Sequence, residues 1–219
     1  MSIAQNLVSI LSTIPESVTL VAVSKTKPIT DLIQAYDAGQ RTFGENKIQE
    51  MAEKWEAMPK DIQWHMIGHV QTNKVKFMAP FVSLIHGVDS LKLLQEINKQ
   101  ALKNNRVIDC LLQMYIAKEE TKFGLDEAEL NEIVTSNEFL SLKNIRVVGL
   151  MGMATFTDNK EQIKTEFTQL KSIFDNSKKL KTENFQLTII SMGMSGDYQV
   201  AIACGSTMVR IGSSIFGGR

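Results

Sequence analysis

Short apolar runs alternate with segments of helical periodicity along the chain. Most of these runs are apolar at adjacent positions, a pattern typical of strands that are covered on both faces. We predict eight strands, over residues 18–25, 41–46, 62–68, 81–88, 106–116, 145–153, 185–192 and 207–212. Helical spacing predicts a helix before the first strand, a short one after the last, and others over residues 31–39, 47–58, 71–78, 91–105, 126–136, 160–177 and 198–205.

Polar and glycine residues at the ends of these segments support the assignment. Thr30 is the expected cap of the helix that Gly39 ends, and Asp89 or Ser90 is the expected cap of the helix over residues 91–105. A capping side chain before the helical period and a glycine after it mark the limits of a helix.

Eight strand–helix units in 219 residues predict an α/β fold, a single (β/α)8 barrel of the TIM type with an extra N-terminal helix. A doubly wound open sheet is the alternative, since it uses the same alternation. No linker, repeat or low-complexity segment divides the chain, so we expect residues 1–219 to form one domain. In such barrels the chemistry lies at the carboxyl ends of the strands.

A lysine ends the first predicted strand. Val21, Val23 and Lys25 alternate and therefore share one face, which otherwise resembles core. A lysine at a barrel mouth is partly desolvated, which frees its amine to attack a carbonyl. The alternative is that the strand simply ends there and the ammonium group extends to water.

Two glycine-containing turns follow the last two strands. Gly212 and Ser213 begin the segment after the eighth strand, and Ser195 lies in the turn "SMGMSG" after the seventh. Backbone N–H groups and serine hydroxyls at such positions bind anions, and phosphate sites recur at these two strands of α/β barrels. The alternative is that these residues are ordinary turn and cap residues.

Three further residues are candidates for ligand contact. Arg210 lies between apolar strand residues and needs a partner, either a carboxylate such as Glu45 or a ligand. Asn46 can bind a ligand or cap the next helix. Met192 can contact the apolar face of a ligand, although packing is the more common role of methionine.

Composition narrows the function classes. Lysine and arginine balance aspartate and glutamate at 24 each, so net charge does not indicate nucleic acid or an anionic membrane surface. Cys110 and Cys204 form no metal or disulfide pattern, and His65 and His69 lack the glutamate of a helical zinc motif. With no secretory signal and no long apolar run, we expect a cytoplasmic protein without metal, membrane or nucleic-acid partners.

A lysine nucleophile, an arginine and a phosphate cradle in one barrel mouth suit a phosphorylated aldehyde held as a Schiff base. Pyridoxal 5′-phosphate is the obvious member of that class. A sugar-phosphate aldolase that uses a Schiff-base lysine fits the same pattern, but no acid/base partner for it is evident.

Several strings then carry a resemblance over nearly the whole chain. They are "VAVSKTKP", "FGENKIQE", "WHMIGHVQTNKVK", "ETKFG", "GLMGMA", "SMGMSGDYQVAI" and "GSTMVRIGSSIFGGR". With them the sequence resembles the pyridoxal phosphate homeostasis protein family, which looks like an isolated alanine racemase N-terminal barrel of fold type III. The resemblance implies pyridoxal 5′-phosphate as cofactor, with Lys25 carrying it as an internal aldimine.

The resemblance also implies roles for the other candidates. Ser195, Gly212 and Ser213 match phosphate-binding positions. Arg210 matches an arginine that faces the pyridine nitrogen, and Asn46 matches a pocket asparagine.

Alanine racemase uses a second domain that supplies a tyrosine base, and we expect none here, since the sequence stops shortly after Gly212. We therefore expect a cofactor carrier in vitamin B6 and amino-acid homeostasis, without turnover of its own. Its expected state is a monomer, with pyridoxal-phosphate-dependent client enzymes as partners. A racemase-like enzyme is the alternative.

Overall fold

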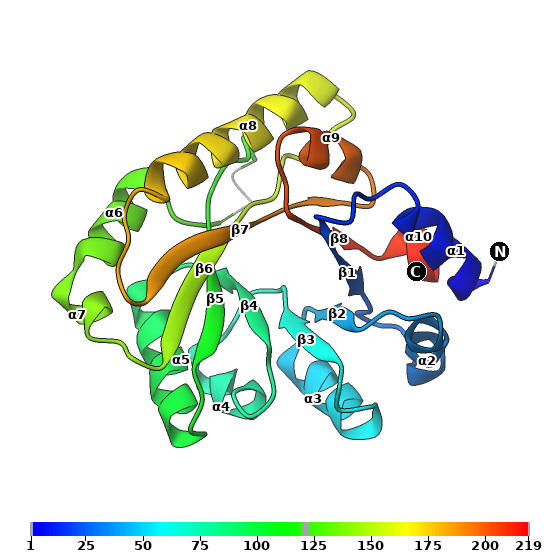
Figure 1. Cartoon of the computed structure of the whole chain (residues 1–219), viewed down its shortest axis with the longest axis horizontal. Helices are drawn as coiled ribbons and strands as arrows, with labels where there is room; N and C mark the ends of the chain where they lie inside the picture. The colour runs from blue at the N-terminus through cyan, green and yellow to red at the C-terminus, as the bar shows by residue number, and fades with distance from the viewer. Residues whose placement is uncertain (1, 120–122, 219) are drawn as a thin grey trace.

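The computed structural model describes residues 2–119 and 123–218, and within them eight parallel strands close into a barrel in chain order (Figure 1). Within the sequence motifs that carry the family resemblance, residues 120–122 and 219 lie outside the described residues. The first strand pairs with the second and also with the eighth, which confirms the predicted barrel and excludes an open sheet. The strands are β1 (Thr19–Val23), β2 (Thr42–Glu45), β3 (Gln63–Met66), β4 (Leu84–Val88), β5 (Ile108–Gln113), β6 (Ile145–Met151), β7 (Phe185–Met194) and β8 (Met208–Ile211).

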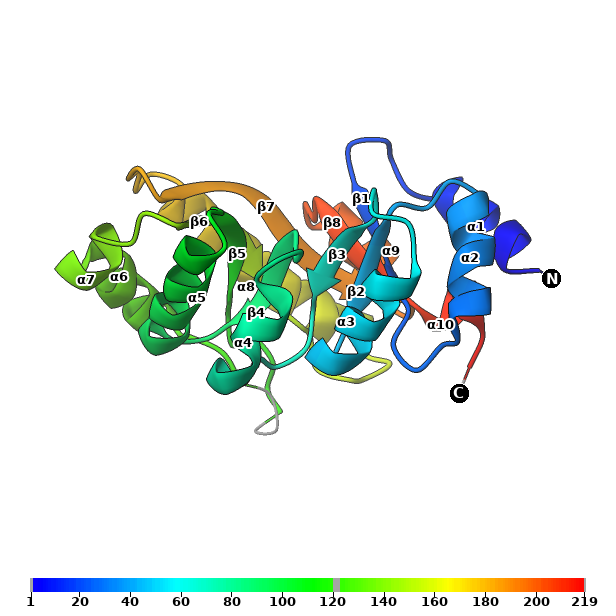
Figure 2. The ribbon, with the colours of Figure 1, turned by 90° about the horizontal axis from the view of Figure 1, so that it is seen from below.

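Helices surround this barrel, and the loops that follow the strands lie on one side of it, the lower side in Figure 2. The helical elements are α1 (Ile3–Leu11), α2 (Ile29–Asp37), α3 (Ile48–Ala57), η1 (Thr72–Lys74), α4 (Val75–Met78), α5 (Leu91–Lys103), α6 (Glu127–Thr135), α7 (Asn137–Leu140), α8 (Lys160–Ser177), α9 (Tyr198–Ala203) and α10 (Ser213–Phe216). No helix in the described ranges has the length and apolar character needed to cross a bilayer.

Some helix ends follow the sequence prediction and others differ. Ser90 caps α5 by accepting a hydrogen bond from the N–H of Leu93 at 3.4 Å. The prediction that Thr30 caps α2 is wrong, because the helix begins at Ile29, two residues before the predicted start, and Pro28 is its N-cap residue. Pro28 has φ −69°, the angle its ring imposes, and no side chain makes a cap hydrogen bond there.

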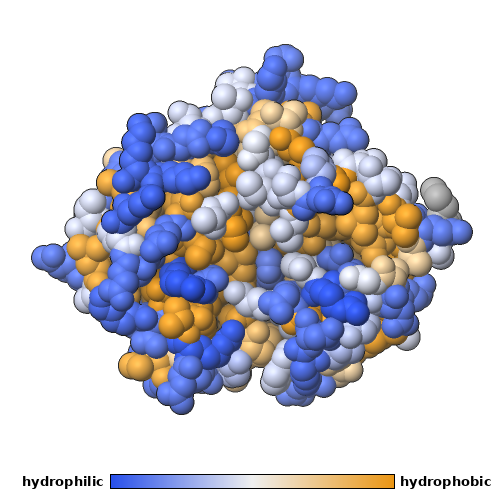
Figure 3. Space-filling view, in the orientation of Figure 1, coloured by the Kyte–Doolittle hydropathy of each residue, from blue (hydrophilic) through white to orange (hydrophobic). Residues whose placement is uncertain are grey.

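The apolar residues form two separate layers. One cluster fills the inside of the barrel and consists of Val21, Leu84, Leu111, Met151 and Met208. A larger cluster lies between the strands and the helices, with Trp64, Phe43 and Phe167 fully buried in it. In the space-filling view, polar side chains gather around the outer edge, and apolar ones show between them (Figure 3).

The N-terminal helix α1 lies beside α10, so the two ends of the chain come together (Figures 1 and 2). The side-chain amide of Asn6 donates a 3.0 Å hydrogen bond to the carbonyl of Ile215. The presence of α1 confirms the predicted N-terminal helix, and this hydrogen bond links it to the end of the chain. It also supports the short helix α10, which begins at the mouth of the barrel.

Candidate functional site

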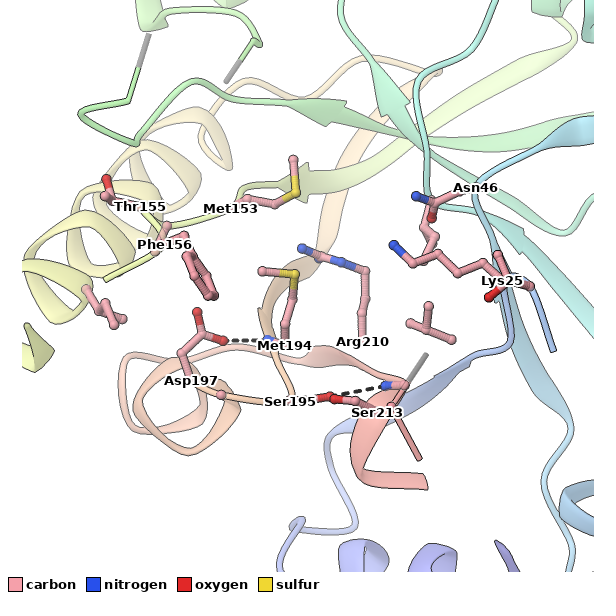
Figure 4. A pocket seen from close by; sticks show the side chains of 18 of the residues that line it. Lys25, Asn46, Met153, Thr155, Phe156, Met194, Ser195, Asp197, Arg210 and Ser213 are labelled. Carbon is pink, nitrogen blue, oxygen red and sulfur yellow. Dashed lines mark hydrogen bonds between the residues drawn. The ribbon is translucent and has the colours of Figure 1, made fainter. Parts of the chain in front are cut away.

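A cavity of about 480 Å³ opens at the carboxyl ends of the strands (Figure 4). Its volume lies in the range that small-molecule sites occupy. Six of the seven residues predicted to bind cofactor line it, namely Lys25, Asn46, Ser195, Arg210, Gly212 and Ser213. They come from the ends of β1, β2, β7 and β8, so the barrel brings together residues that are far apart in the sequence.

Lys25 reaches this cavity because it continues the inward face of β1. Val21 is fully buried inside the barrel, Val23 lines the cavity, and Lys25 follows two residues later. The backbone then turns sharply at Thr26, where φ is +63°. The lysine is half-buried, and its amine points into the cavity toward Arg210 (Figure 4).

The outward face of the same segment holds a buried ionic network. The Ser24 hydroxyl donates to Glu45 Oε1 at 2.6 Å, and Lys54 Nζ donates to the same oxygen at 2.7 Å. Lys54 also donates to the carbonyl of Ser24 at 2.8 Å and to Glu50 Oε1 at 2.7 Å. Burial raises the pKa of Glu45, and the hydrogen bond and charge of Lys54 oppose that rise. The network ties α3 to the end of β1, immediately before Lys25.

Arg210 does not pair with Glu45, the carboxylate that the sequence suggested. A Cβ on Gly44 would lie 2.9 Å from Val21 Cγ1, so Gly44 faces the barrel interior and its neighbour Glu45 faces outward. Arg210 pairs with Val21 across the sheet and shares its inward face. The strand wall therefore separates the two charges.

Arg210 instead bonds to oxygen atoms inside the barrel. Its Nη1 donates to the carbonyl of Ser191 at 2.9 Å and to the Ser191 hydroxyl at 2.6 Å, and its Nη2 donates to the carbonyl of Gly152 at 3.2 Å. Only 4% of the residue is exposed. Burial lowers the pKa of the guanidinium to about 10, while the charge of Asp197 acts to raise it.

Ser195 and Ser213 lie together at the lower edge of the cavity in Figure 4, and Gly212 also lines the cavity. The N–H of Gly212 donates to the Ser195 hydroxyl at 3.2 Å, and Ser213 begins α10, whose first N–H groups have no acceptor within the helix. A Cβ on Gly212 would lie 3.0 Å from the carbonyl oxygen of Val23. Glycine thus lets the loop approach β1 closely and leaves hydroxyl and amide donors beside the cavity.

Met192 is the predicted contact that the structure contradicts. It is fully buried between the barrel and the helices, and Met194 lines the cavity instead. Gly193 has φ +97°, and the pairing of β7 with β8 shifts between Ser191 and Met194. This irregularity turns Met194 toward the mouth.

For Asn46 the sequence left two roles open, contact with a ligand or capping of the next helix. Lys47 is the N-cap residue of α3, and no side chain caps that helix. Asn46 lines the cavity opposite Arg210 and Met153 (Figure 4). Its alternative role as a cap is wrong, and its side chain is placed to contact a ligand.

The loop after β6 supplies cavity residues that sequence reasoning missed. Buried Glu166 accepts from the N–H of Thr155 at 2.6 Å and from its hydroxyl at 2.8 Å, which fixes the loop. The adjacent Phe156 is 90% exposed and borders the cavity with Asp197 (Figure 4). Loop residues have no periodicity, so the only signal was an aromatic residue in a polar segment.

The cavity therefore presents an amine, a buried guanidinium and a set of hydroxyl and amide donors around one volume. Such a site can hold a small anion at the donors while a carbonyl carbon of the same molecule meets the lysine. No carboxylate among the described residues bonds to Arg210, so a ligand acceptor would meet a charge that is only partly balanced.

Comparisons with known proteins identify the family to which this barrel belongs. The family model described as alanine racemase, N-terminal domain, matches residues 1–219. The pyridoxal phosphate homeostasis protein of Aquifex aeolicus is 40% identical over 201 residues, covering 91% of this chain and 86% of the relative. That of Pasteurella multocida is 38% identical over 232 residues, covering 100% and 98%. The chain belongs to the pyridoxal phosphate homeostasis protein family.

A solved structure shows the same fold along the whole length. PipY of Synechococcus elongatus PCC7942, solved with pyridoxal phosphate bound, is 33% identical and superposes with a TM-score of 0.89. The comparison covers 99% of this chain and 100% of that one. Both the fold and the family named from the sequence are thus confirmed.

Replacement of Lys54 by methionine tests the network beneath Lys25. Removing one partner of a buried ion pair leaves Glu45 uncompensated, and we expect a loss of about 3–5 kcal/mol in the free energy of unfolding near pH 7. The folded-state pKa of Glu45 is already raised, and losing Lys54 raises it further. Folding then favours the protonated acid, so stability falls as pH rises and the loss is larger at pH 8 than at pH 5.

Urea denaturation at both pH values measures this loss. Lys103→Met, at the exposed end of α5, is the control for the same substitution without a buried partner. The double variant Glu45→Gln/Lys54→Met should recover most of the stability at pH 8. A Lys54→Met variant that loses the same free energy at both pH values would show that Glu45 does not depend on Lys54.

Proposed function

We propose that this protein binds pyridoxal 5′-phosphate as a Schiff base on Lys25 and acts as a cofactor carrier in vitamin B6 and amino-acid homeostasis. The observation that carries the proposal is the convergence of Lys25, Arg210 and the Ser195–Gly212–Ser213 donors on one cavity. We propose further that the barrel works as one cofactor-binding domain.

The residues present fit this cofactor. When bound, it supplies an aldehyde that condenses with an amine and a pyridine ring that withdraws electrons. Lys25 would hold the aldehyde carbon, and the Ser195 and Ser213 hydroxyls with the N–H groups that begin α10 would hold the phosphate. Asn46 lies beside Lys25 and offers an amide to the bound molecule (Figure 4).

Arg210 would face the ring nitrogen. A guanidinium donates hydrogen bonds but accepts none, so it leaves that nitrogen unprotonated. A ring in that state is a weaker electron sink, which disfavours chemistry that builds a carbanion. This property supports holding the cofactor more than using it.

The family relatives support the same reading. PipY, which shares the fold along its whole length, was solved with pyridoxal phosphate bound, and the curated relatives are named for pyridoxal phosphate homeostasis. The names describe those relatives and not this chain. They nevertheless favour pyridoxal 5′-phosphate over a sugar-phosphate aldehyde as the ligand of this chain.

We propose that the protein does not turn over a substrate of its own. Among the described residues that line the cavity there is no tyrosine or histidine to act as a second base opposite Lys25. Asp197 lies there, but its carboxylate accepts a 2.5 Å hydrogen bond from the N–H of Met194 and serves the turn. Exchange of the Cα hydrogen of any free L-amino acid for deuterium by the loaded protein would contradict this part of the proposal.

In the cell, a carrier of this kind would receive the cofactor and release it to enzymes that depend on it. We propose that these client enzymes are its partners, that it acts in the cytoplasm, and that it does so as a monomer. The opening of the cavity to solvent beside Phe156 suits such exchange.

The absorption spectrum tests the cofactor assignment. Wild-type protein mixed with pyridoxal 5′-phosphate should turn yellow, with a visible band that Lys25→Ala abolishes because the amine is lost. Lys103→Ala, in the last turn of α5 and away from the cavity, should keep the band. A wild type that takes up no cofactor, or a Lys25→Ala variant with an unchanged band, would refute the proposal.

The phosphate cradle makes a separate prediction. Ser195→Ala should weaken binding of pyridoxal 5′-phosphate about tenfold, since it removes a hydrogen bond to a charged group. Binding of pyridoxal, which lacks the phosphate, should change by less than about twofold. Titration of both ligands by absorbance gives the two ratios. Equal losses for both would place the phosphate elsewhere.

A further inference from the structure

A chain of hydrogen bonds runs through the inside of the barrel, behind Arg210. The Ser191 hydroxyl lies 2.6 Å from Arg210 Nη1 and 3.1 Å from His86 Nδ1. His86 Nε2 lies 3.0 Å from His65 Nδ1. All four residues are buried, with 6% exposure or less, and they come from β8, β7, β4 and β3.

The direction of this chain follows from the chemistry of its first member. Arg210 has only donors, so the Ser191 oxygen must accept from it. The hydroxyl hydrogen of Ser191 then needs an acceptor, and in the described part of the chain the one within reach is His86 Nδ1. His86 therefore carries its hydrogen on Nε2 and donates it to His65 Nδ1. His65 in turn carries its hydrogen on Nε2.

Both imidazoles are neutral in this arrangement. Burial lowers the pKa of His65 to about 3. Burial, the adjacent second imidazole and the charge of Arg210 oppose protonation of His86 and lower its pKa well below its usual value. Every acceptor atom of the chain thus faces toward Arg210. These dipoles stabilise a guanidinium that has no carboxylate bonded to it among the described residues.

The hydrogen-bonded chain also leaves some N–H donors of Arg210 for a ligand. A guanidinium has five N–H donors. Ser191 takes both hydrogens of Nη1, and the carbonyl of Gly152 takes one of Nη2. Among the described residues no further acceptor bonds to this side chain, so Nε and the second Nη2 hydrogen remain, on a group whose plane the three bonds have fixed.

We propose that Ser191, His86 and His65 are positioning residues for the cofactor, because they hold Arg210 charged and in one orientation at the mouth. This inference rests on the proposed function, which places Arg210 against the cofactor ring. It assigns a role to two buried histidines and a buried serine that do not themselves line the cavity.

The tautomers of His65 and His86 test the direction of these hydrogen bonds in the wild-type protein, without cofactor. Nitrogen NMR of protein labelled at its three histidines distinguishes the protonated from the unprotonated ring nitrogen. His69→Gln removes the signals of the third histidine, whose side chain is 56% exposed. At pH 7 both remaining rings should carry hydrogen on Nε2 alone. Hydrogen on Nδ1 of His86 would overturn the inference.

The effect on the cofactor is measured with Ser191→Ala, which removes the hydroxyl between Arg210 and His86. We expect the dissociation constant for pyridoxal 5′-phosphate to rise about tenfold, and the visible band of the bound cofactor to shift as Arg210 loses its fixed orientation. Ser206→Ala is the matched control. It is also buried, and its hydroxyl bonds to the carbonyls of Met192 at 2.8 Å and Met208 at 3.0 Å, outside the hydrogen-bonded chain of Arg210.

The outcomes separate this inference from the proposed function. A wild type that takes up no cofactor overturns the function, whatever the tautomers are. A Ser191→Ala variant that binds with wild-type affinity and an unshifted band overturns the positioning role alone. If Ser191→Ala does not fold, the tautomer measurement still decides the direction of the chain.

Discussion

Arg210 donates three hydrogen bonds inside the barrel, and among the described residues none of its acceptors is a carboxylate. A buried guanidinium that stays charged is costly unless oriented oxygen and nitrogen atoms surround it. The backbone carbonyls of Ser191, in β7, and of Gly152, directly after β6, meet this requirement, and the Ser191 hydroxyl connects Arg210 to the histidines. The arrangement leaves positive charge facing the mouth, beside the donors of Ser195 and Ser213, where an anionic ligand would be stabilised.

Strand alternation keeps this cation apart from a second ionic network. The inward face of β1 leads from Val21 to Lys25, while its outward face leads to Ser24 and the pair of Glu45 and Lys54. One network therefore orients Arg210 at the cavity, and the other fixes the backbone from which Lys25 extends. The two sets of charges lie on opposite sides of a strand wall, so neither neutralises the other.

The barrel and most of its mouth could be predicted from the sequence because both depend on local patterns. Parallel strands buried on both faces gave continuous apolar runs, and the alternation of Val21, Val23 and Lys25 placed the lysine correctly. Serine and glycine after β7 and β8 indicated the donors, since their chemistry is carried by the residue type.

The remaining features depend on geometry that no local pattern carries. Gly193 adopts a positive φ, and the register of β7 shifts beside it. As a result Met194 lines the cavity, whereas the sequence had suggested Met192. The partner of Arg210 could not be found without knowing that Gly44 faces inward and Glu45 outward. Phe156 reaches the cavity through a loop that Glu166 anchors from α8, eleven positions beyond Thr155.

We propose that Lys25, and no other lysine, holds the cofactor. Borohydride reduction of the protein loaded with pyridoxal 5′-phosphate, followed by proteolysis and mass spectrometry of the peptides, tests it most directly. We expect a single stoichiometric phosphopyridoxyl adduct, on the peptide that contains Lys25. An adduct at another lysine with Lys25 unmodified, or no stable adduct in protein that has bound the cofactor, would contradict it.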